Sequence, residues 1–517
     1  MSGLCVNEDN AHFYANHPPE DMTPEGVRAL VDYYAHFPGV SALFFCTNVQ
    51  RALFASHAWE RLYDGYNPEA GPDQPILRWL TDPRDRELTR GSQGRHWVHN
   101  LWLLEQRGVD HLAVWLNRCR ELGIEGWLTV RMNDCHYNDT PEAFWHSSFW
   151  REHPEHYRAP QRPEHGWERA LDYAQPAVRL HHLALIRELL DRYDMYGLEL
   201  DWMRWGMHFR PGHEAEGRAA LTDFTRQVRA LARQAARRVG HPLRVGARVP
   251  AQPAEAWALG YDVRAWAEQH LVDHVIVSSF CSGLYYDYPV EAWQALLGNW
   301  RGQLGVCLDA GFTAYPGAAG EQTPVEMHCG AAAAAYQRGV DRVYLFNACY
   351  EESRNRPYLD ELLTRLTDLS TVTAGVRRQV ITFAQTAPPG TAPDAVLPLP
   401  LVNPAPGSSF ARINTFASLR FALGPRPGAG RAWLRLGFSG DTPALRGRQF
   451  SVWCNAVPCA PNREGPSPGH THEAMARWLS WEIPLTALLD DVNVVEFQPP
   501  QVPGAVVWAE ITLDPRC

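Results

Sequence analysis

The chain lacks the features that mark membrane proteins and nucleic-acid-binding proteins. No stretch of its 517 residues approaches about 20 uninterrupted apolar residues, so no membrane-spanning helix is predicted. Its net charge of −10 and pI near 6.1 argue against nucleic acid and acidic membranes, since both attract a basic face. The Arg-rich segment 218–238 has apolar residues at helical spacing, which leaves most of its arginines on a solvated face. We therefore expect no nucleic-acid partner and no membrane partner.

The cysteines do not form the patterns of a disulfide framework or a zinc site. There are eleven, an odd number, and no CxxC pair occurs. Several, such as Cys46 and Cys307, lie in apolar runs, where a free cysteine acts as a small hydrophobic residue. With no basic and apolar leader at the N-terminus, this usage predicts a cytoplasmic protein, or a secreted one if a native leader was removed. The oligomeric state stays open, a homo-oligomer included.

Several catalytic and nucleotide-binding motifs are also missing. Neither GxGxxG nor GxxxxGK[ST] follows a predicted strand, so a doubly wound nucleotide-binding sheet is only the alternative fold. No GxSxG elbow is present, which argues against a serine hydrolase of that kind. No HxH follows the first predicted strand, which argues against two-metal hydrolysis.

Short apolar runs alternate with amphipathic helical patterns over the first 370 residues. Eight such repeats predict an α/β fold, a (β/α)₈ TIM barrel with a parallel sheet wrapped by helices. The predicted strands are 3–7, 40–47, 126–132, 197–201, 243–248, 274–279, 304–309 and 342–347. The predicted helices are 23–36, 110–122, 177–193, 214–238, 261–270, 289–299, 323–338 and 357–368. Long insertions at about 48–109 and 133–176 are expected over the C-terminal mouth, where such barrels carry chemistry.

The composition changes after the eighth repeat. Residues 385–408 are rich in proline and alanine, which is typical of a linker or of the entry to a domain. Short alternating runs separated by turn residues follow, as in a β-sandwich. The sequence therefore predicts a catalytic barrel over 1–370, a linker over 371–395 and an all-β, jelly-roll-like accessory domain over 396–517.

The fourth predicted strand carries the most informative residues. Glu199 and Asp201 lie on one face of it, which in a barrel is the interior, and Asp201 stands at the mouth. Asp309 ends the seventh strand at a similar height. Hydrolysis of a glycosidic bond needs one acid to protonate the leaving oxygen and a second carboxylate as nucleophile or base. We interpret Asp201 as one essential carboxylate, Asp309 as its first-choice partner, and Glu199 as a deeper acid that tunes Asp201 or pairs with an arginine.

Further polar and aromatic residues near strand ends are candidates for binding sugar hydroxyls or orienting a carboxylate. They are Arg131, Asn133, Asp134, His136, Trp202, Arg204, Arg248, Asp287 and Asn347. Asn133 and Asp134 fit a loop cap equally well, and Trp202 and Trp205 fit core packing. The Asp134-x-His136 pair suggests metal ligands, but its spacing places no third ligand, so we expect no metal and no cofactor.

Four segments resemble a bacterial family of glycosyl hydrolase-like barrels, the group labelled glycosyl hydrolase-like family ten. They are RMNDCH, FWREHPEHYRA, ALDYAQPAVRLHHLALIRELLDRYDMYGLELDWMRW and GVDRVYLFNACY, and the similarity spans most of residues 1–370. The most specific part is the pattern G-x-E-x-D-[WF]-M-R that begins at Gly197. The resemblance implies a TIM barrel and a glycosidase, without a settled substrate or catalytic pair. The C-terminal region is similar to galactose-binding-like jelly rolls.

The pattern as a whole predicts a glycosidase with a carbohydrate substrate. Exo action on an imported oligosaccharide is favoured over action on a polymer, because the chain is expected in the cytoplasm. Two alternatives stay open. One is a non-catalytic carbohydrate-binding barrel, and the other is a lyase or transglycosidase on the same fold.

Overall fold

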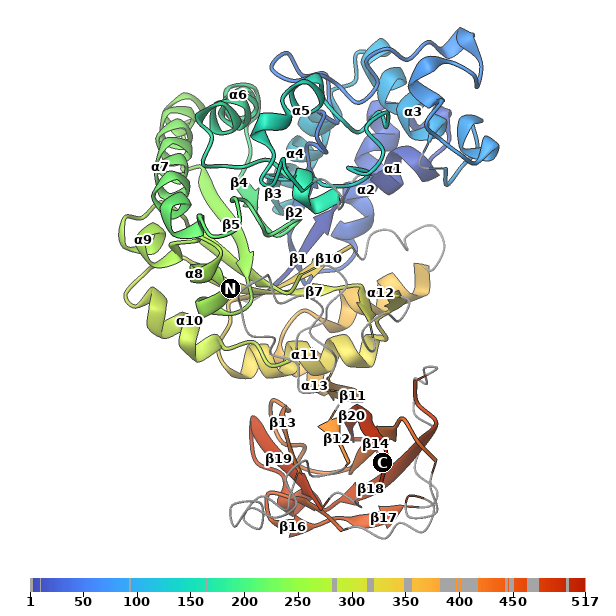
Figure 1. Cartoon of the computed structure of the whole chain (residues 1–517), viewed down its shortest axis with the longest axis vertical. Helices are drawn as coiled ribbons and strands as arrows, with labels where there is room; N and C mark the ends of the chain where they lie inside the picture. The colour runs from blue at the N-terminus through green and yellow to red at the C-terminus, as the bar shows by residue number, and fades with distance from the viewer. Residues whose placement is uncertain are drawn as a thin grey trace.

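The computed structural model describes residues 3–9, 11–92, 94–162, 166–280, 286–313, 320–347, 356–381, 397, 399–401, 417–441, 445, 451–462, 474–498 and 502–516. Its first domain is a closed parallel barrel with strand order β1-β10-β7-β6-β5-β4-β3-β2, which confirms the predicted TIM-type fold (Figure 1). The strands are β1 (Gly3–Glu8), β2 (Val40–Cys46), β3 (Glu125–Arg131), β4 (Gly197–Asp201), β5 (Arg244–Pro250), β6 (His274–Ser278), β7 (Gln303–Asp309) and β10 (Arg342–Phe346).

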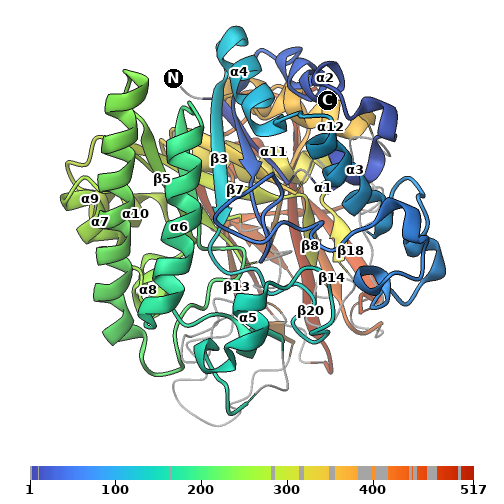
Figure 2. The same cartoon turned by 90° about the horizontal axis from the view of Figure 1, so that it is seen from above.

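Helices surround the barrel close to their predicted positions. They are α2 (Pro24–Ala35), α4 (His111–Leu122), α6 (Pro176–Arg192), α7 (Glu214–Val239), α9 (Val263–Glu268), α10 (Val290–Leu297), α11 (Val325–Gln337) and α12 (Arg356–Arg365). Figure 2 shows α6 and α7 side by side on the outside of the barrel. Gly240 ends α7 with a φ of 84°, the left-handed conformation expected of a glycine at that position. Within the described ranges, no helix is both long and apolar enough to cross a bilayer.

The two long insertions form extra structure above the barrel. The first carries α3 (Arg95–Gln106) and the second carries α5 (Ser148–Glu152), neither of which was predicted. Aromatic contacts join them, since Trp97 meets Trp145 edge-on with ring centroids 4.7 Å apart, and Trp79 meets Phe144 at 5.1 Å. Further short helices are α1 (Ala11–Asn16), α8 (Pro253–Ala258) and α13 (Leu369–Thr373). The insertions therefore build one continuous wall beside the β2 and β3 ends of the mouth.

Apolar side chains fill the lower half of the barrel. Phe44 stacks on Trp127 with centroids 5.0 Å apart and meets Tyr344 edge-on, also at 5.0 Å. Cys5, Ile276 and Phe346 belong to the same buried cluster. Because this plug closes the barrel from below, the polar residues of the strands gather at the C-terminal mouth.

The second domain consists of antiparallel strands in two main sheets, as predicted for an all-β domain. One sheet has the order β11-β20-β14-β18-β17 with β12 on β20, and the other has the order β13-β19-β15-β16. Its strands are β11 (Arg377–Ile381), β12 (Leu399–Pro400), β13 (Ala417–Ala422), β14 (Arg431–Phe438), β15 (Val452–Cys454), β16 (Val457–Pro458), β17 (Ala460–Asn462), β18 (Arg477–Ile483), β19 (Val492–Phe497) and β20 (Ala505–Asp514). A small separate sheet joins β8 (Gly311–Thr313) to β9 (Gly320–Gln322).

The predicted linker over 371–395 needs correction. Residues 377–381 form β11, which pairs with β20 along its whole length. The prolines and alanines that suggested a linker begin only at Gln385, whereas Val380 is fully buried and belongs to a strand. Residues 382–395 lie outside the described part of the chain.

Helix α11 lies between the two domains (Figure 1) and is buried along most of its length. Its central sequence GAAAAA has side chains small enough for close approach of β11 on one side and the barrel on the other. Gln379 donates a hydrogen bond to the Gly330 carbonyl at 2.6 Å. At the C-terminal end of the helix, Arg338 bonds Asp491 of the β domain at 2.9 Å. Both domains therefore meet on one helix.

Replacing Gly330 by alanine tests this contact. An added Cβ would lie 2.1 Å from the Arg378 carbonyl oxygen, and that oxygen belongs to backbone that cannot yield easily. We expect Gly330→Ala to lower the free energy of unfolding by about 1–3 kcal/mol, the usual effect of overpacking. Gly428→Ala is the matched control, because nothing lies within 4 Å of its added Cβ. Equal denaturant midpoints for the two variants would contradict the close packing.

Candidate active site

Asp201, the last residue of β4, is held by an arginine from the neighbouring strand. Arg248 Nε donates to Asp201 Oδ1 and Nη2 to Oδ2, both at 2.9 Å, in a bidentate ion pair. Oδ1 also accepts the backbone N–H groups of Met203 (2.9 Å) and Arg204 (3.1 Å). Asp201 and Arg248 are buried. Although burial opposes the charge of Arg248, Asp201 holds the pKa of this guanidinium well above its usual value.

Arg248 itself is supported from two other strands. Nη1 donates to the Ser278 hydroxyl on β6 at 3.0 Å. The guanidinium lies over the ring of Phe346 on β10, 4.0 Å from its centroid. The ion pair is thus fixed on the upper surface of the apolar plug.

Glu199 lies one layer below Asp201 and is completely buried. Its Oε2 accepts hydrogen bonds from the Thr129 hydroxyl and, at 3.0 Å, from the Tyr344 hydroxyl. Burial and the negative charge of Asp201 raise the pKa of Glu199 to about 7. This position is consistent with the prediction that Glu199 tunes Asp201. Tyr344, a member of the apolar plug, connects the plug to Glu199.

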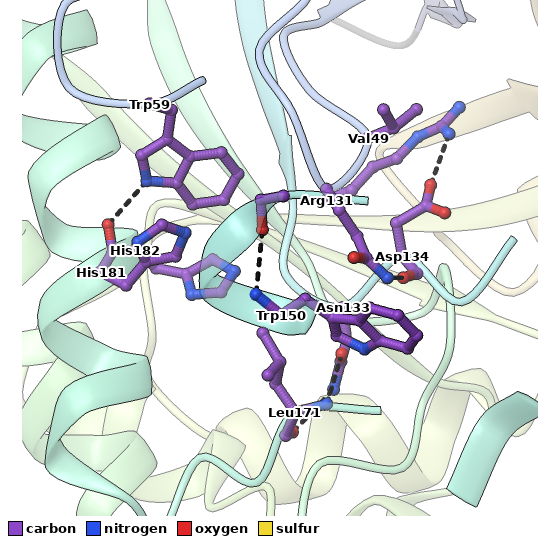
Figure 3. A pocket seen from close by; sticks show the side chains of 11 residues that line it. Val49, Trp59, Arg131, Asn133, Asp134, Trp150, Leu171, His181 and His182 are labelled. Atoms are coloured by element: carbon purple, nitrogen blue, oxygen red, sulfur yellow. Dashed lines mark hydrogen bonds and ion pairs between the residues drawn. The ribbon is translucent and has the colours of Figure 1, made fainter. Parts of the chain in front are cut away.

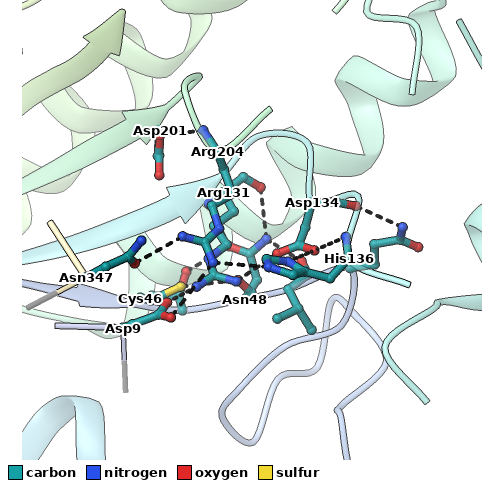
Figure 4. A network of polar contacts seen from close by, with 12 residues as sticks. Asp9, Cys46, Asn48, Arg131, Asp134, His136, Asp201, Arg204 and Asn347 are labelled. Atoms are coloured by element: carbon teal, nitrogen blue, oxygen red, sulfur yellow. Dashed lines mark hydrogen bonds and ion pairs between the residues drawn. The ribbon is translucent and has the colours of Figure 1, made fainter. Parts of the chain in front are cut away.

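A second ionic network occupies the ends of β1 and β3 (Figure 4). Arg131 forms ion pairs with Asp9, just beyond β1, and with Asp134, at 2.8 Å. Asn48 anchors the strand end, since its side chain exchanges hydrogen bonds with the Arg131 backbone at 3.0 and 3.1 Å. Asp9 is a bridging acid, because it pairs with Arg131 and lies 4.0 Å from Arg204 Nη2. Because side chains along a strand alternate between its two faces, the side chains of Asn7 and Asp9 are expected on the same face.

The network continues through His136 and Arg204. His136 Nδ1 lies 2.8 Å from Asp134 Oδ1, and its Nε2 lies 3.3 Å from Arg204 Nη2. Arg204 Nη1 donates to the Asn347 side chain at 3.3 Å. Burial opposes the charge of Asp134, but His136 and Arg131 outweigh burial and hold its pKa well below the usual range. The structure therefore joins Arg131, Asp134, His136, Arg204 and Asn347, which the sequence had placed on three separate strands.

Asp309 is the last residue of β7 and is buried. Its Oδ1 accepts the backbone N–H of Gly311 at 3.0 Å. Cys307, two residues earlier on the same face, lies 3.9 Å from Arg248 Nη1. Burial raises the pKa of Cys307 to about 12, with further contributions from the charges of Asp309 and Asp201. Asp201 and Asp309 thus end two strands of the same barrel, β4 and β7, which are separated by β5 and β6.

Trp202 does not line the mouth, contrary to its prediction as a substrate-binding residue. It is fully buried and packs edge-on against Tyr173 and His208, with ring centroids 5.1 and 5.0 Å away. The residue after Asp201 leaves the barrel interior because successive side chains of a strand alternate. Trp202 therefore packs in the core, which was the alternative interpretation of this residue.

Asp287 also lies away from the mouth and is corrected. It pairs with Arg338 of α11 at 2.6 Å and with Arg420 of β13 at 3.0 Å. These partners belong to the interface between the barrel and the β domain. Strand assignment alone could not show this, because Asp287 lies nine positions beyond Ser278, the last residue of β6.

Asn133 anchors a loop beside a cavity that adjoins the second network. Its side chain exchanges hydrogen bonds, both of 2.9 Å, with the backbone of Leu171 in the insertion. The cavity is lined by Val49, Gln50, Trp59, Arg131, Asn133, Asp134, Ser147, Trp150, Leu171, His181 and His182 (Figure 3). Because both the oxygen and the nitrogen of its amide bond to the Leu171 backbone, Asn133 caps a loop. This is the alternative role given for it in the sequence analysis.

The chain is similar to known proteins in structure, but it matches no known family. No family model and no curated protein matches the chain, so the resemblance to glycosyl hydrolase-like family ten stays a prediction. α-L-Fucosidase isoenzyme 2 from Paenibacillus thiaminolyticus is 13% identical over 71% of this chain and 49% of that chain, with a TM-score of 0.43. This chain thus spans about half the length of that enzyme.

Two further solved structures are similarly distant. The PgaB (BpsB) glycoside hydrolase domain from Bordetella bronchiseptica is 12% identical over 71% of this chain and 99% of that chain, with a TM-score of 0.39. A glycoside hydrolase family 20 β-N-acetylglucosaminidase is 14% identical over 70% and 68%, with a TM-score of 0.37. At these identities, the roles of residues here rest on the geometry of this chain itself.

The Arg248–Asp201 pair makes a prediction about stability. Arg248→Met leaves a buried carboxylate without its cation, so we expect a loss of about 3–5 kcal/mol in the free energy of unfolding. Arg264→Met is the control, because Arg264 forms an exposed pair with Glu268 at 2.8 Å, and such pairs contribute about 1 kcal/mol or less. Urea denaturation of both variants measures the difference, and similar losses would show that Asp201 does not depend on Arg248.

Glu199 makes a prediction about pH. Between its ordinary pKa of 4.5 and the folded value of about 7, the folded protein keeps a proton that the unfolded chain has lost. This group therefore lowers stability as pH rises through that window, by a total on the order of 3 kcal/mol. Glu199→Gln removes the dependence, so its stability relative to the native chain should increase from pH 4.5 to pH 7. Parallel stability–pH curves for the two proteins would refute the raised pKa, and Glu268→Gln serves as an exposed control.

Proposed function

We propose that the protein is a glycoside hydrolase that uses Asp201 and Asp309 as its carboxylate pair. The observation that carries this proposal is that Asp201 and Asp309 are the last residues of two strands of the closed barrel, β4 and β7, so both acids stand at its C-terminal mouth. Two carboxyl groups flanking one bond are what glycosidic hydrolysis needs. The position at the C-terminal mouth is the one where TIM barrels hold their catalytic groups.

Asp201 suits the role of nucleophile or base. An ionised carboxylate offers about four acceptor positions. Oδ1 accepts hydrogen bonds from N–H groups of Arg248, Met203 and Arg204. Among the described residues, only Arg248 donates to Oδ2. Oδ2 therefore keeps capacity to attack the anomeric carbon, or to take a proton from a water that attacks it. Its negative charge also stabilises the oxocarbenium-like transition state.

Asp309 is proposed as the acid that protonates the leaving oxygen as the glycosidic bond breaks. Asp309 is the candidate because it is a buried carboxyl group at the end of another strand of the same mouth, where its Oδ1 accepts the Gly311 N–H at 3.0 Å. Asp134 fits the role less well because its cationic neighbours hold its pKa low. Asp287 is excluded by its place at the domain interface.

The rim of the mouth supports carbohydrate as the substrate class. His136, Arg204 and Asn347 offer polar groups, and half-buried Trp205 meets the His136 ring edge-on at 5.8 Å. Tyr137 beside them is 41% exposed, enough to contact a sugar face. The wall formed by the two insertions favours a closed-ended pocket, so we propose exo action on oligosaccharides.

Activity measurements on two variants test the carboxylate pair. A panel of chromogenic glycosides and labelled oligosaccharides first identifies a cleaved substrate. On it, Asp201→Asn and Asp309→Asn should each lose about 10²–10⁴-fold in turnover, because each removes a group that moves a proton or attacks carbon. Asp223→Asn, an exposed change on α7, should keep full activity. Asp201→Asn leaves the buried Arg248 without its anion, so this variant should melt at a lower temperature than the native chain. Circular dichroism at the assay temperature shows whether all three variants are folded.

The same assays separate the alternatives. If Asp201→Asn keeps more than about a tenth of the activity, the assignment of Asp201 is wrong. If only Asp309→Asn does so, the second acid lies elsewhere. An oligosaccharide that binds the native chain but is never cleaved would favour the non-catalytic barrel. Exo action requires a monosaccharide as the first product, whereas longer first products would refute it.

A further inference from the structure

A cluster of metal-ligating side chains lies in the second insertion, away from the mouth residues described above. His153, Glu155 and His156 follow α5, the last two within the 3₁₀ turn η5 (Pro154–His156). One ligand atom from each of the three lies within 4.8 Å of the others. Within the described ranges, no other group of three or more His, Cys, Asp or Glu side chains meets this condition.

An aromatic column holds the two imidazoles. The rings of His153 and His156 lie 5.2 Å apart at 25°, and Phe149 packs against both, at 5.6 and 5.5 Å. Phe149 in turn stacks on His181 at 4.0 Å, and His181 stacks on Trp59 at 4.3 Å. The ligand rings are therefore supported from the cavity side, while the opposite side faces solvent.

The donor atoms of the cluster are incompletely satisfied by the protein. His153 Nδ1 lies 2.8 Å from Glu155 Oε1. Nδ1 of His156 is buried and has no hydrogen-bond partner among the described residues. A buried imidazole nitrogen without a partner is unfavourable, and a metal ion or a proton partner supplied from outside would relieve it.

We propose that His153, Glu155 and His156 bind one divalent transition-metal ion of the zinc type. Two imidazoles and one carboxylate suit zinc and its neighbours better than calcium or magnesium, which prefer oxygen ligands. Tetrahedral zinc with ligands at about 2.0–2.1 Å requires ligand atoms about 3.3 Å apart. The ligand atoms, now within 4.8 Å of one another, would have to move closer together to reach this geometry, and water would complete the fourth position.

The ion would stabilise the insertion beside the active-site network. Helix α5 carries Trp150, whose backbone N–H donates a hydrogen bond to the Ser147 hydroxyl. Both residues line the cavity, as does Asp134. Coordination at η5 would tie the end of α5 to the following turn. The role is therefore structural, and it does not depend on the proposed glycosidase activity.

Zinc titration of the metal-free full-length protein tests the site. Isothermal titration calorimetry should show one Zn²⁺ per native chain, and the affinity should fall at least tenfold in the double variant His153→Ala/His156→Ala. His213→Ala is the matched control, because His213 forms an exposed pair with Glu216 at 2.9 Å without a second imidazole. That variant should bind zinc like the native chain.

Thermal unfolding gives a second readout. Zinc should raise the melting temperature of the native chain and of His213→Ala, but not that of the double variant, since only folded protein with an intact site gains from binding. If the double variant fails to fold, Glu155→Gln replaces it as the test, because it keeps both imidazoles. Glu155→Gln should bind zinc more weakly than the native chain does. Equal zinc affinity in the native chain and the site variants, or no binding by the native chain at 100-fold molar excess, would overturn the proposal.

Discussion

The buried pair of Arg248 and Asp201 is the interaction on which the mouth of the barrel depends. A charge inside a parallel barrel is unfavourable unless it is paired and hydrogen-bonded. Here the pairing follows from sheet register, because Asp201 of β4 lies directly beside Arg248 of β5. The chain contains no lysine, so all 48 basic side chains are arginines. Their planar guanidinium groups form the bidentate contacts and the stacking on Phe346 that a lysine could not reproduce.

The same requirement organises the rest of the mouth. Asp9 and Asp134 share Arg131, and His136 connects Asp134 to Arg204. Below them, Glu199 forms no ion pair with an arginine of the described ranges. Its pKa is raised, because burial beside a charged neighbour favours its protonated form. Charged groups are thus concentrated in one layer above the apolar plug.

The surrounding domains support this layer from two sides. The insertions cover the β2 and β3 ends, and Asn133 connects one of them to the strand end through Leu171. On the other side, Phe312, three residues after Asp309, packs near Trp508 of the β domain with centroids 6.2 Å apart. The β domain therefore contacts the segment that follows one of the two proposed catalytic acids, as well as helix α11.

The sequence by itself determined the barrel, the all-β second domain, and the direction of Glu199 and Asp201. Those features follow from periodicity, which depends only on neighbouring residues along the chain. Tertiary structure decided which acids are paired: Asp9 with Arg131, Asp201 with Arg248, and Asp287 with Arg338 at the domain interface. It also decided that Trp202 packs in the core and that residues 377–381 join a sheet. The physical reason is that ion pairs and strand pairing join residues far apart in sequence, and their partners become neighbours only when the barrel closes and the second domain packs against it.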